Sequence, residues 1–283
     1  MSAQNKIARH NHLTSALLRV CVWAAGIVTL AALVFIVVYI LIKGVPHLKP
    51  DLFAWEFTSD NQSMMPSLIN TVIVTICSLL LAVPVGIGAA VYLTEYATRG
   101  NKLVKVVRTT AQTLSGIPSI VYGLFGNLFF VKFCGMGKSL TAGILTLSIM
   151  ILPLIMRTTE EAILAVPDSY REGSFGLGAG KLRTVFQIVL PSAVPGILSG
   201  VILGIGRIVG ESAALIYTAG TATDAISSLM DSGRTLTVHM YNLSNEGLYI
   251  DQTYATAVVL LIVVVAINYL SSLAAKKLES KHG

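Results

Sequence analysis

Six stretches of this chain are apolar over roughly the 20 residues that a helix needs to cross a lipid bilayer. They cover residues 20–42, 68–93, 111–131, 139–156, 194–219 and 254–273. The first stretch carries no charge and follows Lys6, Arg9 and Arg19. It is too long for the core of a secretory signal, so we expect a retained helix. The pattern predicts an all-α polytopic membrane protein with six transmembrane helices.

Two of these stretches contain an internal proline, Pro84 in the second and Pro118 in the third. A proline removes a backbone donor from the helix and can kink it. Kinked or broken helices often line transport pathways, but kinks also serve simple packing. For residues 115–119 both interpretations stay open.

Composition and charge agree with a membrane protein. Charged residues make up 12% of the chain and hydrophobic residues 54%, with a mean hydropathy of +0.75, whereas soluble domains carry about 25% charged residues. Fourteen lysines and arginines fall on the side of the amino terminus and five on the other side. Because basic residues accumulate on the cytoplasmic side, we expect a multi-pass protein of the cytoplasmic (inner) membrane with both termini in the cytoplasm.

The spacing of the stretches suggests three parts. Residues 1–66 form a cytoplasmic tail, the first helix and an outer loop, residues 67–275 form a five-helix core, and residues 276–283 form a cytoplasmic tail. The outer loop at 220–253 has a net charge of −3. It is either a landing surface for an extracytoplasmic protein or a solvated connector.

A polar segment at residues 160–192 separates the fourth and fifth apolar stretches. It is longer than a simple connector and contains helical signals interrupted by glycines. We expect two short helices that meet at residues 178–180 and offer a surface to a soluble partner. The candidate coupling residues are Arg171, Glu172, Gly178, Lys181, Ile188, Leu190 and Pro191.

The strongest candidate for substrate contact is Arg207, which lies inside the fifth apolar stretch. Glu211 follows four residues later, so on a continuous helix the two side chains would share one face and partly neutralise each other. An arginine at membrane depth costs about 2.5–3.5 kcal/mol on insertion scales. The planar guanidinium suits oxyanions, which favours an anion pathway. The alternative is a salt bridge that locks this helix to a neighbour.

Three further residues are candidates for the same pathway. Arg157 ends the fourth apolar stretch and is either a second anion contact or a basic anchor at the membrane surface. Ser119 and Tyr122 follow Pro118 and could line the pathway with polar groups.

No pattern for catalysis or metal binding accompanies these residues. The five histidines are scattered, and residues 137–139 lack the earlier glycine of a phosphate-binding loop because Lys132 occupies that position. We therefore expect no catalytic site, no metal, no cofactor of its own and no nucleic-acid partner.

With these residues in view, the sequence resembles the permease subunits of phosphate ABC importers, and among them the PstA type. Glu172, Gly178, Ile188 and the Leu190–Pro191 pair follow the spacing of the coupling motif of importer permeases. Segments 116–123, 152–162, 207–211 and 236–242 carry the resemblance to the phosphate branch, which extends over residues 66–273. The motif's two alanines are replaced by Gly173 and Ser174.

This resemblance implies a type I importer (MetI-like) fold with cytoplasmic coupling helices and an ATP-driven import of inorganic phosphate. It also implies a PstC-like second permease, a PstB-like ATPase dimer that binds the ATP and docks at the coupling loop, and a PstS-like phosphate-binding protein at the outer face. Alternatives are another oxyanion such as sulfate, molybdate or phosphonate, a PstC-type subunit, and a regulatory membrane protein that senses the transporter.

Overall fold

The computed structural model describes residues 3–98 and 100–279, and the side chains of residues 15–98 and 100–273. Throughout these residues the regular structure is helical, with no strand. Five helices are long and apolar enough to cross a membrane, and the count reaches six if one bent pair of helices is taken as a single span. The all-α membrane class is confirmed, with five or six spans in the described residues. The long helices are α1 (Ala3–Gly44), α2 (Met65–Val91), α5 (Leu140–Leu164), α8 (Leu190–Val209) and α11 (Ile250–Glu279).

The third span is not the single helix that we expected at 111–131. It consists of α3 (Lys102–Ser115) and α4 (Ser119–Gly126), continued by a π-helical turn (Asn127–Phe133), and the chain bends by 104° between them. Pro118 explains the break, since it lacks a backbone N–H and disfavours helical geometry in the residue before it. The hydroxyl of Tyr122 donates a 2.9 Å hydrogen bond to the Leu114 carbonyl and so satisfies the end of α3.

The fifth span also differs from the expected helix at 194–219. It begins earlier, because α7 (Lys181–Thr184) and a π-helical turn (Val185–Val189) run directly into α8. It ends earlier too, at Val209, and a separate short helix α9 (Ala213–Thr218) follows the break. The second coupling helix that we expected is therefore the first part of one long helix.

The centre of the bundle is α5, against which α2 and α8 pack. Glycines allow the close approach: a Cβ on Gly86 would lie 2.8 Å from Ile155, and a Cβ on Gly204 would lie 3.2 Å from the same side chain. Leu147 and Ile151 are fully buried in the main apolar cluster. Small residues at these positions let helices pack tightly where lipid supplies no hydrophobic driving force.

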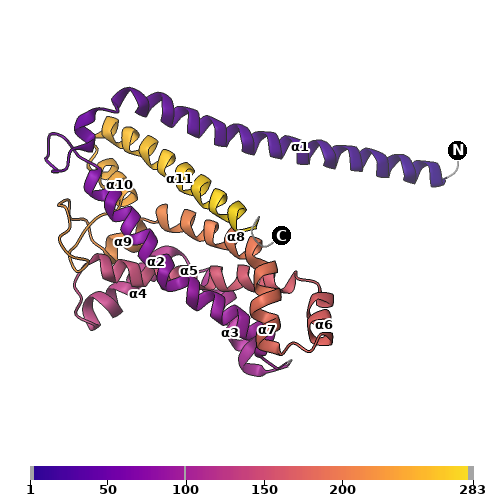
Figure 1. The fold of residues 1–283 in the computed structure, drawn as a ribbon. Helices are drawn as coiled ribbons and strands as arrows, with labels where there is room; N and C mark the ends of the chain where they lie inside the picture. The colour runs from indigo at the N-terminus through magenta and orange to yellow at the C-terminus, as the bar shows by residue number, and fades with distance from the viewer. Residues whose placement is uncertain (1–2, 99, 280–283) are drawn as a thin grey trace.

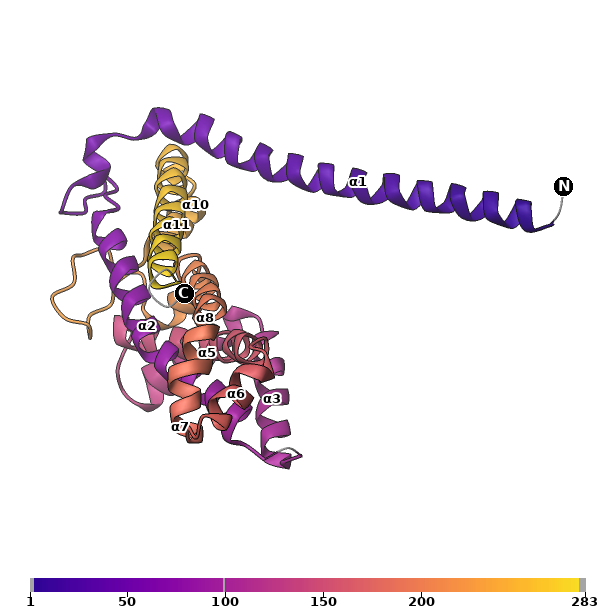
Figure 2. The ribbon, with the colours of Figure 1, turned by 45° about the vertical axis from the view of Figure 1, so that its right-hand side comes forward.

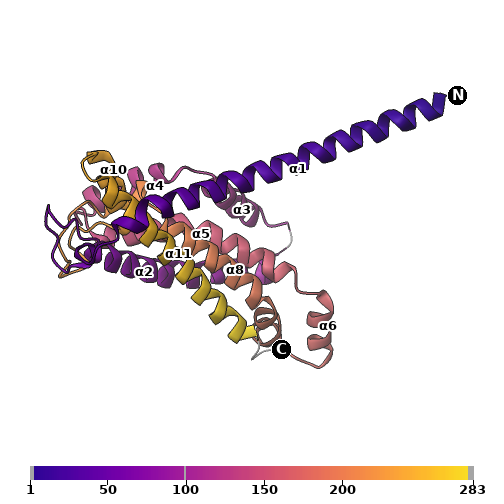
Figure 3. The same cartoon turned by 90° about the horizontal axis from the view of Figure 1, so that it is seen from above.

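The elements outside the core mark two opposite ends of the bundle (Figures 1 and 2). α10 (Leu236–Glu246) lies at one end, and α6 (Asp168–Gly176) and α7 lie at the other. We refer to them as the α10 end and the α6 end. Seen from above, α6 projects beyond the bundle, and α1 extends away from it (Figure 3). At its last residue, Gly44, α1 packs closely against the backbone of Tyr254 in α11.

The expected boundary between the core and the final tail falls inside a helix. α11 continues to Glu279, across the boundary at residues 275 and 276. Residues 1–2, Arg99 and residues 280–283 lie outside the described part of the chain.

Candidate functional site

The break between α8 and α9 carries the two charged residues that the sequence singled out. Arg207 sits in the last turn of α8 and is half-buried, whereas Glu211 lies in the break and is only 8% exposed. A carboxylate oxygen of Glu211 accepts a 3.0 Å hydrogen bond from the Ala214 backbone N–H, which holds the start of α9. Glu211 therefore caps a helix, because carboxylates stabilise unpaired N–H groups at a helix start.

The expected ion pair between Arg207 and Glu211 is not formed. The four-residue spacing would align the two side chains only on a continuous helix, and α8 ends at Val209. Among the described residues, no carboxylate lies within 4.0 Å of the Arg207 guanidinium. A half-buried cation without a protein counter-ion attracts an anion more strongly than a paired one does.

The bend between α3 and α4 lies beside this break. A Cβ on Gly123 would come within 2.7 Å of the Ala214 Cα, so α4 and α9 are in backbone contact. Asn127 donates a 2.7 Å hydrogen bond to the Tyr217 carbonyl and fixes the same pair of helices. Tyr122 is buried and lies within electrostatic range of Arg207. Two interrupted helices thus meet near Arg207, and membrane proteins tolerate such interruptions where the backbone is buried in protein or lines a water-filled cavity.

Ser119 of α4 lies at this site, whereas Arg157 of α5 lies away from it. Ser119 is half-buried in the first turn of α4, one turn before Tyr122. Arg157 lies on α5 next to Thr158, whose side chain packs against Gly200 of α8. Gly200 is seven residues before Arg207 along α8, or roughly 10 Å along the helix axis. Arg157 is therefore about two turns closer to the α6 end than Arg207.

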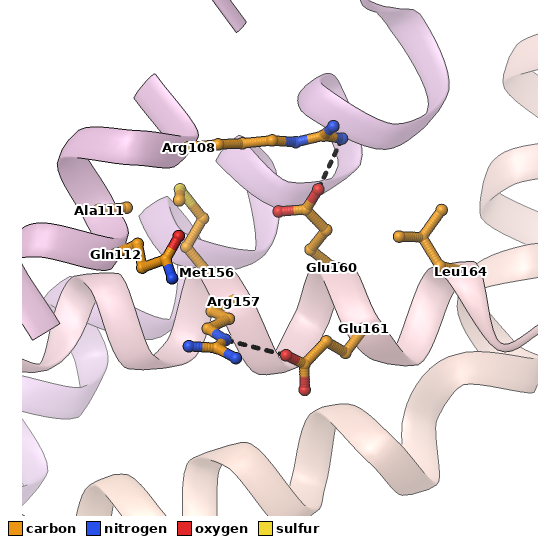
Figure 4. Close-up of a pocket in the computed structure, with 8 residues that line it drawn as sticks. All are labelled: Arg108, Ala111, Gln112, Met156, Arg157, Glu160, Glu161 and Leu164. Carbon is orange, nitrogen blue, oxygen red and sulfur yellow. Dashed lines mark hydrogen bonds and ion pairs between the residues drawn. The ribbon is translucent and has the colours of Figure 1, made fainter. Parts of the chain in front are cut away.

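Arg157 lines a hollow between α3 and α5 (Figure 4). Its guanidinium donates to Glu161 at 2.9 Å, and both side chains are more than half exposed. A second arginine, Arg108 of α3, forms a 2.6 Å ion pair with Glu160 across the same hollow. Sequence spacing did not reveal this second pair, because its two members lie 52 positions apart. Any anion that reaches this hollow must compete with carboxylates for the arginines.

The coupling segment forms one isolated helix, α6, and a turn that leads into α7. Gly178 has a φ of +82°, a left-handed conformation that glycine adopts without strain. Glu172 and Lys181 are exposed, and Leu177 is 91% exposed. α6 contains no buried residue. Ile188, Leu190 and Pro191 instead belong to the long helix that continues into the bundle.

Arg171 behaves differently from its neighbours in α6. Its side chain is 16% exposed and faces the bundle, where it forms a 2.8 Å ion pair with Glu95 at the end of α2. From the sequence we expected it among the residues that contact a soluble partner. Nothing in the sequence indicated the contact with Glu95, which lies 76 positions away.

A second cluster of polar residues lies buried near the start of α10. Arg234 is 4% exposed, and its guanidinium carbon lies 4.7 Å from the centre of the Phe57 ring. Burial lowers the pKa of Arg234 to about 10, an effect that Glu246 partly opposes. His239 is fully buried, and burial together with the Arg234 charge lowers its pKa to about 3. The imidazole is therefore neutral at physiological pH.

This architecture and its charged break agree with the family to which the sequence is related. Residues 82–282 match the family of binding-protein-dependent transport system inner membrane components, and the chain belongs to this family. It is thus the multi-pass permease subunit of an ABC importer, a transport component without catalytic activity that works with an ATPase and a substrate-binding protein.

Two relatives and two solved structures illustrate the match. The chain is 34% identical over 241 residues to the probable ABC transporter permease protein YqgI of Bacillus subtilis, covering 78% of this chain and 80% of that one. It is 37% identical over 203 residues to the phosphate transport system permease protein PstA 2 of Mycobacterium bovis, covering 70% and 66%. The fold is similar to a chain of a bacterial alginate ABC transporter, with a TM-score of 0.68, 17% identity and 98% of both chains covered. It is also similar to a chain of the MetNI methionine ABC transporter, with a TM-score of 0.55, 21% identity and coverage of 78% and 94%.

Proposed function

We propose that this subunit is of the PstA type and carries inorganic phosphate across the cytoplasmic membrane into the cell. The observation that carries the proposal is the half-buried Arg207 at the junction of two interrupted helices, without an ion-pair partner in the described structure. A guanidinium offers a planar set of donors that matches the oxygens of a tetrahedral oxyanion. The relatives named as PstA proteins, at 34–42% identity, support phosphate as the anion.

The proposed path has two arginines at different depths. Arg207 receives the anion at the helix break, with Tyr122 and Ser119 beside it, and Glu211 holds the break in shape. Arg157 provides a second contact closer to the α6 end. Its guanidinium is already paired with Glu161, and this competition promotes release of the anion. Because Arg207 is only half-buried and Arg157 is paired with Glu161, phosphate is bound without being trapped.

The energy for this movement comes from a partner. Moving an anion into a negative cell interior costs about 2.3 kcal/mol per charge per 100 mV, so a divalent phosphate requires an external source. We assign ATP binding to a PstB-like ATPase dimer, docked on the exposed residues of α6 and on the hollow between α6 and the start of the long helix. The α6 end then faces the cytoplasm, as do both termini. A PstC-like permease completes the membrane unit, and a PstS-like phosphate-binding protein docks at the α10 end.

The test is the substitution Arg207→Gln in the complete transporter, reconstituted in vesicles with labelled phosphate. We expect uptake to fall by at least tenfold while the complex still assembles, because the anion loses a charge-assisted contact of about 1.5–3 kcal/mol. Lys132→Gln, which removes an exposed lysine elsewhere, serves as the control. Normal uptake by Arg207→Gln would refute the pathway role. If unlabelled sulfate or molybdate inhibits the uptake of labelled phosphate as unlabelled phosphate does, the assigned anion would change.

A further inference from the structure

The terminal turn of α2 is contacted by basic side chains from three other elements. This turn (Tyr92–Tyr96) is π-helical and ends the helix. Arg171 of α6 pairs with its Glu95, and the Lys181 ammonium of α7 lies 5.3 Å from the centre of the Tyr96 ring. Arg108 of α3 donates to the Leu93 carbonyl at 3.3 Å. Three cations from three helices therefore converge on five residues.

Arg171 is the most heavily bonded of these cations. Its Nε and Nη2 donate to one carboxylate oxygen of Glu95 at 3.1 and 2.8 Å. Two further bonds reach the end of α5, to the carbonyls of Ile163 at 3.0 Å and Val166 at 2.8 Å. It also meets Asp168 in its own helix at 3.2 Å. A planar fork with several bonds in fixed directions holds its partners in one geometry, which a lysine cannot do.

Few other side-chain contacts hold α6 to the bundle. α6 buries no residue, so it has no apolar core of its own. Among the described residues, its other side-chain hydrogen bond to a different element joins Ser174 to Thr184 in α7. Arg171 is thus the side-chain link that connects α6 with the ends of α2 and α5. Both members of the ion pair are shielded from solvent, with 16% of Arg171 and 11% of Glu95 exposed.

We propose that Arg171 and Glu95 are positioning residues that transmit the displacement of α6 to α2. A partner that moves α6 pulls on α2 through this single guanidinium, whereas α5 is joined to α6 directly by residues 165–167 of the chain. Loss of the ion pair lets α6 move without α2, so that ATP is hydrolysed with less transport. The inference rests on the proposed docking of an ATPase at α6, but it does not depend on which anion is carried.

The experiment compares Glu95→Gln with Asp168→Asn in the complete transporter in proteoliposomes. Both changes remove a carboxylate that contacts Arg171, but Asp168 is 85% exposed and lies in the same helix, so α6 stays attached to α2 without it. The readouts are ATP hydrolysis stimulated by the loaded binding protein, and the number of anions taken up per ATP hydrolysed.

We expect Glu95→Gln to lower uptake per ATP by about fivefold or more, the range of a typical coupling between two sites, with assembly preserved. Asp168→Asn should match the unmodified transporter. An unchanged ratio in an assembled Glu95→Gln complex would overturn the proposal. So would a complex that no longer assembles, because the pair would then serve structure alone. If sulfate rather than phosphate is carried, the same ratio is measured with sulfate, so the two proposals fail separately.

Discussion

The buried His239 makes a quantitative prediction about stability and pH. Its ring is fully buried, and its pKa is lowered from 6.5 to about 3 by burial and by the Arg234 charge. In the unfolded chain the imidazole takes up a proton near pH 6.5, whereas in the folded chain it stays neutral until about pH 3. The unfolded state therefore binds more protons in this interval, and the folded state loses stability as the pH falls through it.

The size of the effect follows from the two pKa values. Between pH 7 and pH 5 the contribution of His239 falls by about 2 kcal/mol, and the full loss below pH 3 approaches about 5 kcal/mol. About 2 kcal/mol corresponds to a fall of roughly 4–8 °C in the unfolding midpoint of a chain of this size. About two fifths of the full effect therefore falls between pH 7 and pH 5.

The variant His239→Leu supplies the comparison, because it removes one titrating group and leaves the others in place. Thermal unfolding of both proteins in lipid nanodiscs is measured at pH 7 and at pH 5. We expect the unmodified protein to lose about 2 kcal/mol more than the variant on acidification. Equal losses in the two proteins would refute the reasoning, since other titrating groups would then account for the whole acid sensitivity.

Two further predictions concern glycines. Gly123→Ala places a Cβ within 2.7 Å of the Ala214 backbone and should lower stability by about 1–3 kcal/mol in a thermal unfolding assay, whereas Gly88→Ala, with open space around its Cβ, should not. Equal midpoints for the two variants would contradict the close contact between α4 and α9. Gly178→Ala imposes a side chain on a φ of +82° at a cost of about 1 kcal/mol, which should reduce co-purification of the ATPase, while Gly247→Ala, with a φ of +68° and open space at the α10 end, leaves it unchanged.

The positions of the membrane helices could be predicted from the sequence, because apolar length is a local property. Pro118 also indicated a possible break in the third span, for a reason that lies in the residue itself. The break after Val209 could not be seen in the same way. It covers only three residues, 210–212, between two apolar segments, and the carboxylate of Glu211 bonds to the backbone of Ala214 instead of to Arg207. The Glu211 carboxylate had two possible partners nearby, the Arg207 guanidinium and the Ala214 N–H. The four-residue spacing favoured Arg207, which was wrong.

In the candidate site, too, some features could be predicted from the sequence and others could not. Arg207 and the exposed residues of the coupling segment are visible in sequence because a charge among apolar residues, or a polar run between them, is unusual. The contacts of Arg171 with Glu95, and of Arg108 with Glu160, join residues 76 and 52 positions apart. Such pairs depend on how helices are placed in space, and a single sequence carries no periodic signal for them.

The lack of any buried residue in α6 has a consequence for how such transporters diversify. Substitutions on an exposed helix usually change folding free energy by less than about 0.5 kcal/mol. The outward side chains of α6 can therefore be substituted during evolution to bind a different ATPase subunit, provided that Arg171 keeps its bonds. Partner choice and membrane architecture can evolve on separate sets of residues within this one subunit.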